Sequence, residues 1–317
     1  MRRVFFIESG GTFLKKMMML ALALVLSIGI AACSEKVIEE QGGLPHVDSA
    51  FLHIHGLGYS ADGKRLLIPV HNGLSIYTNG MWSEGSGEKH DYMGFAAADN
   101  GFYSSGHPAP GSPYKNPLGL IKSTNDGKTI TVLALEGEVD LHGMTVGYRT
   151  HTLYVLNPQP NSKMKQAGLY VSQDEGQTWT NSTLSGIHGQ ITSIAAHLTE
   201  KSVVIVGTTV GVYFSKDNGQ TFTTLDTDHP VSALAFMDSG EALVATSGPD
   251  PSLVKVDVET KQTVTIKTPN KDRIAFIAQS PASPKELAIA TEQKDVYIST
   301  DRGVTWRQIA NKGVRSK

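Results

Sequence analysis

The chain has 317 residues, of which 40% are hydrophobic and 18% are charged, and its formal net charge is −2. A single cysteine excludes an internal disulfide and any metal cluster built from several cysteines. The near-neutral charge lacks the basic footprint of a nucleic-acid-binding protein, so we expect no nucleic-acid partner.

Residues 1–32 have the pattern of a secretory signal peptide rather than of a folded element. Lys15 and Lys16 form the positively charged region that precedes the apolar stretch of a signal peptide. The apolar stretch here, 17–30, is short for a membrane span. The small residues before Cys33 resemble a bacterial lipobox, in which the cysteine becomes the lipidated first residue of the mature protein. The resemblance implies a protein on the extracytoplasmic face of the bacterial cell membrane, anchored to the membrane through Cys33.

Residues 33–49 are mostly polar, and we expect them to form a flexible tether between the lipid and the folded domain. The folded domain is expected to span residues 50–312, followed by a short tail at 313–317. Short apolar runs separated by turn residues fill the domain, and its sequence contains no segment of useful length with helical periodicity. The sequence therefore predicts an all-β fold.

One eight-residue pattern recurs in this domain. Ser172 to Trp179 reads Ser-Gln-Asp-Glu-Gly-Gln-Thr-Trp, and each copy follows a short apolar run. We expect a tight β-hairpin, because the Asp or Asn side chain bonds to the turn backbone and the Gly supplies the positive φ that the turn needs. The structural positions of the four copies are Ser123, Asn125 and Gly127; Ser172, Asp174, Gly176 and Trp179; Ser215, Asp217, Gly219 and Phe222; Ser299, Asp301, Gly303 and Trp306.

These copies resemble the Asp-box, or BNR repeat, with the pattern S-x-D-x-G-x-T-W. Sialidases, sortilin-like receptors and photosystem assembly factors carry it. The resemblance implies a β-propeller in which each box stabilises a hairpin and lies away from the ligand site.

The spacing of the boxes predicts the number of blades. They start at 123, 172, 215 and 299, and the last gap is twice a single repeat. Degenerate hairpins without the full motif occur where the period requires them, near residues 78 and 257. A period of 40 to 50 residues of strand pattern is typical of a propeller with four strands per blade. We therefore predict six blades, with each box between the third and fourth strand, over 53–82, 92–133, 142–183, 191–225, 231–266 and 274–309.

Histidines and aspartates gather in the first half of the domain. Loops between blades and between second and third strands share one face, here called the top. His53 and His55 are expected to open the first strand of blade one, and other candidates lie at equivalent strand starts or in top loops. Clustered imidazoles and carboxylates suit Zn or Cu. The candidate ligands for a metal ion, a small molecule or a partner protein are His53, His55, His71, Asp91, His107, Asp140 and His142.

Three functions remain open. The stretches around His53, His107 and His142 resemble bacterial lipoproteins named glycosylhydrolases, over essentially the whole mature chain. Non-catalytic binding at the top face is the first interpretation. A glycoside hydrolase that uses top-face carboxylates is the alternative, with Asp91, Glu136, Glu138 and Asp140 as candidates. A scaffold that binds another protein across the top is the third. Standard sialidase chemistry is disfavoured, because only Arg273 of the six arginines after the signal maps to the top.

Overall fold

The computed structural model describes residues 50–227 and 229–316. The predicted signal peptide, the tether and Cys33 lie outside these residues. Within the described residues, no helix is long and apolar enough to cross a membrane.

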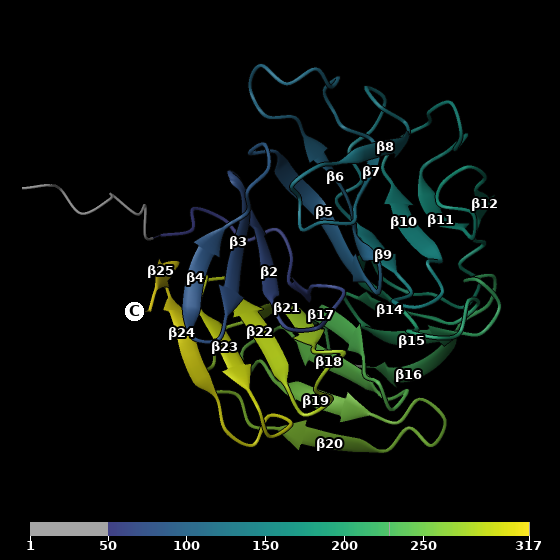
Figure 1. The fold of residues 1–317 in the computed structure, drawn as a ribbon. Coiled ribbons are helices and arrows are strands. Elements are labelled where there is room, and N and C mark those ends of the chain that lie inside the picture. Colours follow the sequence, from purple (N-terminus) through teal and green to yellow (C-terminus); the bar gives the residue numbers. More distant parts are fainter. Residues whose placement is uncertain (1–49, 228, 317) are drawn as a thin grey trace, which may run out of the picture. The chain divides into compact units, whose positions relative to one another are not determined.

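The described chain forms six antiparallel sheets, each built from strands that follow one another in sequence (Figure 1). In Figure 1 the strands β5, β9, β17 and β21 lie towards the middle, and β4, β8, β12, β16 and β20 lie at the rim. The predicted six-bladed propeller with four strands per blade is confirmed. The first three blades contain β1 (Gly58–Tyr59), β2 (Leu66–Val70), β3 (Gly73–Thr78) and β4 (Met81–Glu84); β5 (Asp91–Ala98), β6 (Gly101–His107), β7 (Leu120–Ser123) and β8 (Thr131–Ala134); and β9 (Met144–Val146), β10 (Leu153–Asn157), β11 (Gly168–Ser172) and β12 (Thr180–Asn181).

The second half of the described chain repeats the arrangement, and its last blade has an extra strand. These blades contain β13 (Ile191–Ala196), β14 (Val204–Thr208), β15 (Gly211–Ser215) and β16 (Thr223–Thr227); β17 (Val231–Phe236), β18 (Ala242–Thr246), β19 (Leu253–Val256) and β20 (Thr263–Ile266); and β21 (Ile274–Gln279), β22 (Leu287–Thr291), β23 (Val296–Ser299), β24 (Arg307–Asn311) and β25 (Val314–Arg315). The degenerate hairpins predicted near 78 and 257 are the β3–β4 and β19–β20 turns.

The hydrophobic core of the described domain is divided among the contacts between blades. Six clusters of buried side chains are present in residues 50–316, and each joins two neighbouring blades. One of them packs Tyr59 and Leu66 of the first blade against Ala288 and Val296 of the last. Because burial of apolar surface drives folding, this cluster closes the ring.

The Asp-boxes form the hairpins that the sequence predicts. In the box of blade three, Ser172 Oγ accepts a hydrogen bond from the backbone N–H of Gly176 at 2.8 Å and donates to Asp174 Oδ1 at 2.8 Å. Asp174 also accepts from the backbone N–H of Thr178 at 2.9 Å and from its hydroxyl at 2.6 Å. The boxes at Ser215 and Ser299 repeat these contacts.

Each box also contacts the blade before it. Trp179 packs into the cluster between blades two and three. Phe222 takes the equivalent place between blades three and four, and Trp306 takes it between blades five and six. The glycine lies so close to the preceding blade that a Cβ on Gly176 would stand 2.4 Å from Leu120 Cδ2. A box therefore stabilises its own hairpin through hydrogen bonds and also packs into the interface between two blades, here called the seam.

The last residues of the chain differ from the expected tail. Val314 and Arg315 form β25 beside β24, and the backbone N–H of Phe51 donates to the carbonyl of Gly313 at 2.8 Å. The Arg315 guanidinium lies 5.2 Å from the ring centre of Phe51 and 5.6 Å from that of Trp82. Cation–π contacts and backbone pairing therefore connect the two ends of the domain.

We expect Gly176→Ala to destabilise the propeller more than Gly80→Ala. Both glycines have positive φ, 82° and 85°, but an added Cβ on Gly80 meets no atom within 4 Å. At either site an alanine forced into this positive φ lowers the free energy of unfolding by about 1–2 kcal/mol. The contact with Leu120 adds about 1–3 kcal/mol at Gly176 alone. Urea unfolding of both variants measures the loss in free energy of unfolding relative to the wild type. Equal losses in the two variants would contradict the role of the box in the contact between blades.

Acid should weaken the boxes in a defined pH range. The hydroxyl and backbone N–H of Thr178 hold the pKa of Asp174 at about 2, below its ordinary value of 3.8. A lowered folded-state pKa stabilises the fold above the unfolded pKa, and that stabilisation is lost as the pH falls from about 4 to 2. The difference in free energy of unfolding between the wild type and Asp174→Asn should therefore become smaller as the pH falls through this range. Thermal melts at several pH values test it, with exposed Glu259→Gln as the control.

Candidate metal centre

The seven candidate residues lie at one end of the first three blades. Two expected positions are wrong in detail. His53 and His55 precede β1, which begins at Gly58, and Asp140 and His142 precede β9, which begins at Met144. The chain enters each of these strands as irregular backbone, although Val139 and Leu141 already pack between blades two and three before β9 begins. Of the seven residues, Asp91 opens β5, His107 ends β6 and His71 lies in the β2–β3 turn.

His53, His55, His71 and Asp91 form one group, which we call the first cluster. His71 Nδ1 lies 2.8 Å from Asp91 Oδ2 and 3.3 Å from His55 Nε2, and His55 Nε2 lies 3.5 Å from Asp91 Oδ1. The rings of His53 and His55 are nearly parallel, with centres 6.0 Å apart, and the His53 ring centre is 4.8 Å from that of His71. Three separate segments of the chain therefore bring these side chains together.

The spacing of three of these atoms matches a transition-metal site. One ligand atom from each of His55, His71 and Asp91 lies within 4.8 Å of the other two. In a tetrahedral zinc site each ligand atom lies about 2.0–2.2 Å from the metal, so ligand atoms are about 3.3 Å apart. His55 Nε2 and His71 Nδ1 are 3.3 Å apart; His71 Nδ1 lies 2.8 Å from Asp91 Oδ2, and His55 Nε2 lies 3.5 Å from the other carboxylate oxygen, Oδ1. These separations are close to those that one bound zinc ion would require.

Burial shapes the electrostatics of the first cluster. Burial lowers the pKa of His55 below its ordinary value; Asp91 opposes this shift, and His71, His53 and His142 add to it. Asp91 Oδ1 is buried and has no hydrogen-bond partner within the described part of the chain. A buried carboxylate oxygen without a partner is costly, and a bound cation would compensate it.

His107, Asp140 and His142 form the second cluster. Asp140 Oδ2 lies 2.6 Å from His142 Nε2 and 3.4 Å from His107 Nε2. On its other side the His107 ring bonds Asn116 Oδ1 through Nδ1 at 2.7 Å. The two clusters adjoin, because Asp91 and His107 face each other as partners in the β5–β6 ladder.

A cavity of about 490 Å³ lies along the inner strands, and His55 and His142 are both in its lining. Small side chains, including Ala97, Ala196 and Ala233, line much of it beside larger apolar ones. This volume falls within the usual range for small-molecule sites. Of the seven candidates only these two histidines line it; the other five gather beside its upper end.

Other polar groups have different roles. Glu136 accepts from the backbone N–H of Lys115, and Glu138 accepts from the backbone N–H of Ser162, so both hold loops. Arg273 pairs with Glu292 at 3.0 Å.

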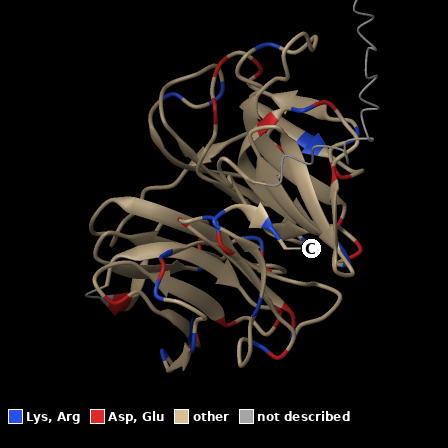
Figure 2. Cartoon of the chain, turned by 90° about the vertical axis from the view of Figure 1, so that its left-hand side faces the viewer, with Lys and Arg blue, Asp and Glu red and all other residues tan. Residues whose placement is uncertain are grey.

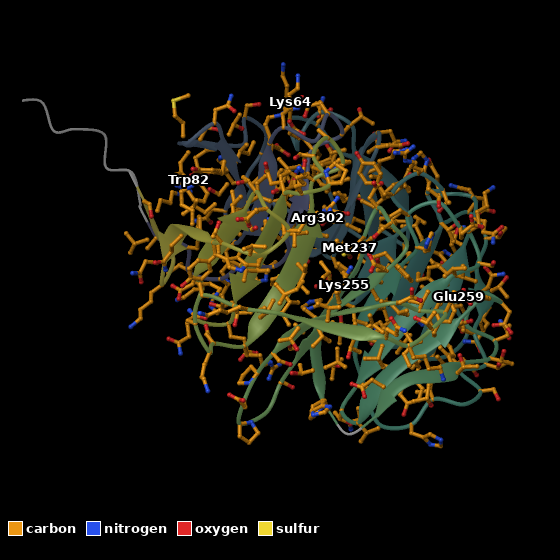
Figure 3. The ribbon with its side chains drawn as sticks, turned by 90° about the horizontal axis from the view of Figure 1, so that it is seen from below. Lys64, Trp82, Met237, Lys255, Glu259 and Arg302 are labelled. Atoms are coloured by element: carbon orange, nitrogen blue, oxygen red, sulfur yellow. The ribbon has the colours of Figure 1, made fainter. Side chains whose placement is uncertain are left out.

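From below, Met237, Lys255 and Arg302 border a smaller cavity of about 300 Å³ (Figure 3). Figure 2 shows acidic and basic residues interspersed over the loops and strands of the face it presents.

Three supporting residues were not among the candidate site residues predicted from the sequence. His90 is buried and its Nδ1 accepts from the backbone N–H of Ala109, which holds the start of the 108–117 loop. Asn116 orients His107 from the far end of the same loop. The Ser105 hydroxyl accepts from the backbone N–H of Leu141, next to Asp140. In these contacts Ser105 and His107 lie in β6, and the other residues lie in irregular segments, where no periodicity marks them.

Comparisons with known proteins agree with this architecture. The family model for the BNR/Asp-box repeat matches residues 297–308. No curated protein sequence matches the chain. Among solved structures, a GH74 enzyme of Niastella koreensis is similar, with a TM-score of 0.54 and 17% identity over 82% of this chain and 46% of that one.

Two further structures extend the comparison. An ancestral GH74 enzyme has a TM-score of 0.53 and 13% identity, over 83% of this chain and 39% of its own. A chain of a nidogen/laminin complex has a TM-score of 0.56 and 10% identity, over 74% of this chain and 88% of its own. The protein spans less than half of either GH74 chain. At these identities the likeness extends to the fold alone.

Proposed function

We propose that this protein is a membrane-anchored Asp-box propeller that binds a divalent transition-metal ion, zinc or copper, through His55, His71 and Asp91. The observation that carries the proposal is the convergence of ligand atoms from three separate chain segments within 4.8 Å of one another. We assign the protein a binding role at its top face, because these side chains are arranged as ligands.

The donor set selects the kind of ion. Two imidazole nitrogens and one carboxylate oxygen suit zinc and copper better than calcium or magnesium, which prefer oxygen ligands alone. Three protein ligands leave a coordination position for a further group. His53 is the nearest additional imidazole in the described residues and supplies a fourth ligand in the proposal. A bound small molecule or a side chain of a partner protein would otherwise take that position.

The membrane anchor is proposed from the lipobox-like sequence before Cys33. A lipid on this residue would place the propeller on the outer side of the cell membrane, tethered by residues 33–49. At that location the top-face ligands would meet extracellular metal ions or periplasmic partners.

Metal binding can be measured directly on the untagged protein made from its full-length sequence. Titration with Zn²⁺ should show tight binding, and elemental analysis should find stoichiometric metal after dialysis. His71→Ala and Asp91→Asn should each weaken binding at the first cluster by at least about 10–100-fold, because each removes a ligand whose neighbours remain in place. His188→Ala is the matched control, since this exposed histidine lies in the loop before β13. Tight binding that both site variants retain would contradict the proposed site.

The anchor has a separate test. In a bacterial host, Cys33→Ala should move the protein from the membrane fraction to the soluble fraction, because the acylated thiol is lost. Labelling with a radioactive fatty acid should mark the wild-type protein and not the variant. A variant that stays in the membrane fraction would contradict lipid anchoring through Cys33.

A further inference from the structure

We infer that the cavity along the inner strands binds a small organic acid. Its carboxylate completes the coordination of the ion at the first cluster, and its apolar body lies deeper in the cavity. The inference rests on the proposed function, since it names the class of ligand that the same site takes. Its evidence is separate, because it comes mainly from cavity residues that are not proposed metal ligands.

Three inner strands carry a β-bulge at the same position. In β13, β17 and β21 the second residue is left out of the pairing with the neighbouring strand; these residues are Thr192, Ser232 and Ala275. A bulge of this kind re-aims a side chain, and bulges are frequent next to active sites. All three extra residues line the cavity. The same irregularity is therefore repeated around the cavity in three successive blades.

The bulges lie at the upper end of the cavity. The inner strands of the blades are equivalent, so their first residues lie at the same end of the ring as Asp91, which opens β5. His55 and His142 precede the inner strands β1 and β9, and both line the cavity. The upper end is therefore surrounded by two imidazoles on one side and by Thr192 and Ser232 on the other.

His55 connects the proposed ion to this space. Its Nε2 lies 3.3 Å from His71 Nδ1, and its ring is part of the cavity lining. An ion bound to Nε2 at about 2.0–2.1 Å therefore lies at the end of the cavity. Zinc with three protein ligands binds a fourth group and can expand to five ligands, so a head group from the cavity can join it.

The charges at this end favour an anionic head group. A divalent ion and the carboxylate of Asp91 together carry one positive charge. The Oδ2 atom of Asp140 is directed to His142 at 2.6 Å and to His107 at 3.4 Å. On the opposite side of the cavity the hydroxyl of Thr192, an exposed residue, can donate a hydrogen bond to a carboxylate oxygen.

Deeper along the inner strands the lining is apolar. Phe95, Ile194 and Phe276 line the cavity and are only partly buried. A ligand that covers them removes apolar surface from water, which favours binding. The volume of about 490 Å³ suits a small molecule. A space that is polar at one end and apolar further in matches an acid with a single apolar group.

The probe for this inference is 4-phenylbutanoate. The zinc-loaded, untagged full-length protein should bind one molecule per chain in calorimetric titration. Acetate lacks the apolar body and 4-phenylbutanol lacks the carboxylate, so each should bind at least about tenfold more weakly. In the Co²⁺-loaded protein, 4-phenylbutanoate should also change the visible absorption spectrum, because its carboxylate joins the ion.

Two variants fill the upper end of the cavity. Ala275→Leu and Thr192→Leu should each weaken binding of 4-phenylbutanoate at least about tenfold, because the larger side chain occupies the space of the ligand. Neither residue is a proposed metal ligand, so the affinity for zinc should stay unchanged. Thr192 is exposed, so its variant should fold even if Ala275→Leu does not. Ala167→Leu is the matched control, since this exposed alanine lies between β10 and β11, outside the cavity lining.

The contrary outcomes are distinct. A protein that binds zinc but not 4-phenylbutanoate would overturn this inference and leave the proposed function standing. Equal affinity for the probe in the wild type, Ala275→Leu and Thr192→Leu would overturn the assignment to the cavity. Probe binding that is as tight without zinc as with it would overturn the role of the ion in holding the carboxylate. A wild type that binds no zinc would overturn the proposed function and, with it, this inference.

Discussion

Burial of apolar side chains between neighbouring blades is the interaction on which the described structure depends. Each sheet is four or five strands wide, and its core is complete only when another blade covers it. The last sheet packs on the first through Tyr59 and Val296, which closes the ring. The Asp-boxes contribute to these contacts, since three of them place an aromatic residue and a glycine against the blade before them. The rigidity of the seams allows irregular loops at the top to hold side chains in fixed positions.

The top-face clusters depend on this framework. His71 lies in a turn between two buried strands, and Asp91 and His107 face each other across the β5–β6 ladder. Buried neighbours hold Asp140 from a loop between blades. Each proposed ligand therefore comes from a segment whose ends are fixed by the core, as a preorganised site requires. The GH74 structures share the fold at low identity.

The fold could be predicted from the sequence because the Asp-box motif repeats along the chain. Ser172, Ser215 and Ser299 begin copies of one local motif whose hydrogen bonds are made within eight residues, so the pattern and the structure coincide. The prediction was less accurate where long-range contacts decide the structure. The pairing of Phe51 with Gly313, which makes a strand of the expected tail, joins residues at opposite ends of the domain. The bond between His107 and Asn116 depends on the path of one loop, which no periodicity encodes.

The central claim is that His55, His71 and Asp91 hold one metal ion together. A crystal structure of the zinc-loaded protein, with anomalous diffraction recorded on both sides of the zinc absorption edge, tests this most directly. The account predicts a zinc peak about 2.0–2.2 Å from His55 Nε2, His71 Nδ1 and an Asp91 carboxylate oxygen. A zinc-loaded crystal with no peak among these three side chains, or with the side chains apart from one another, would contradict it.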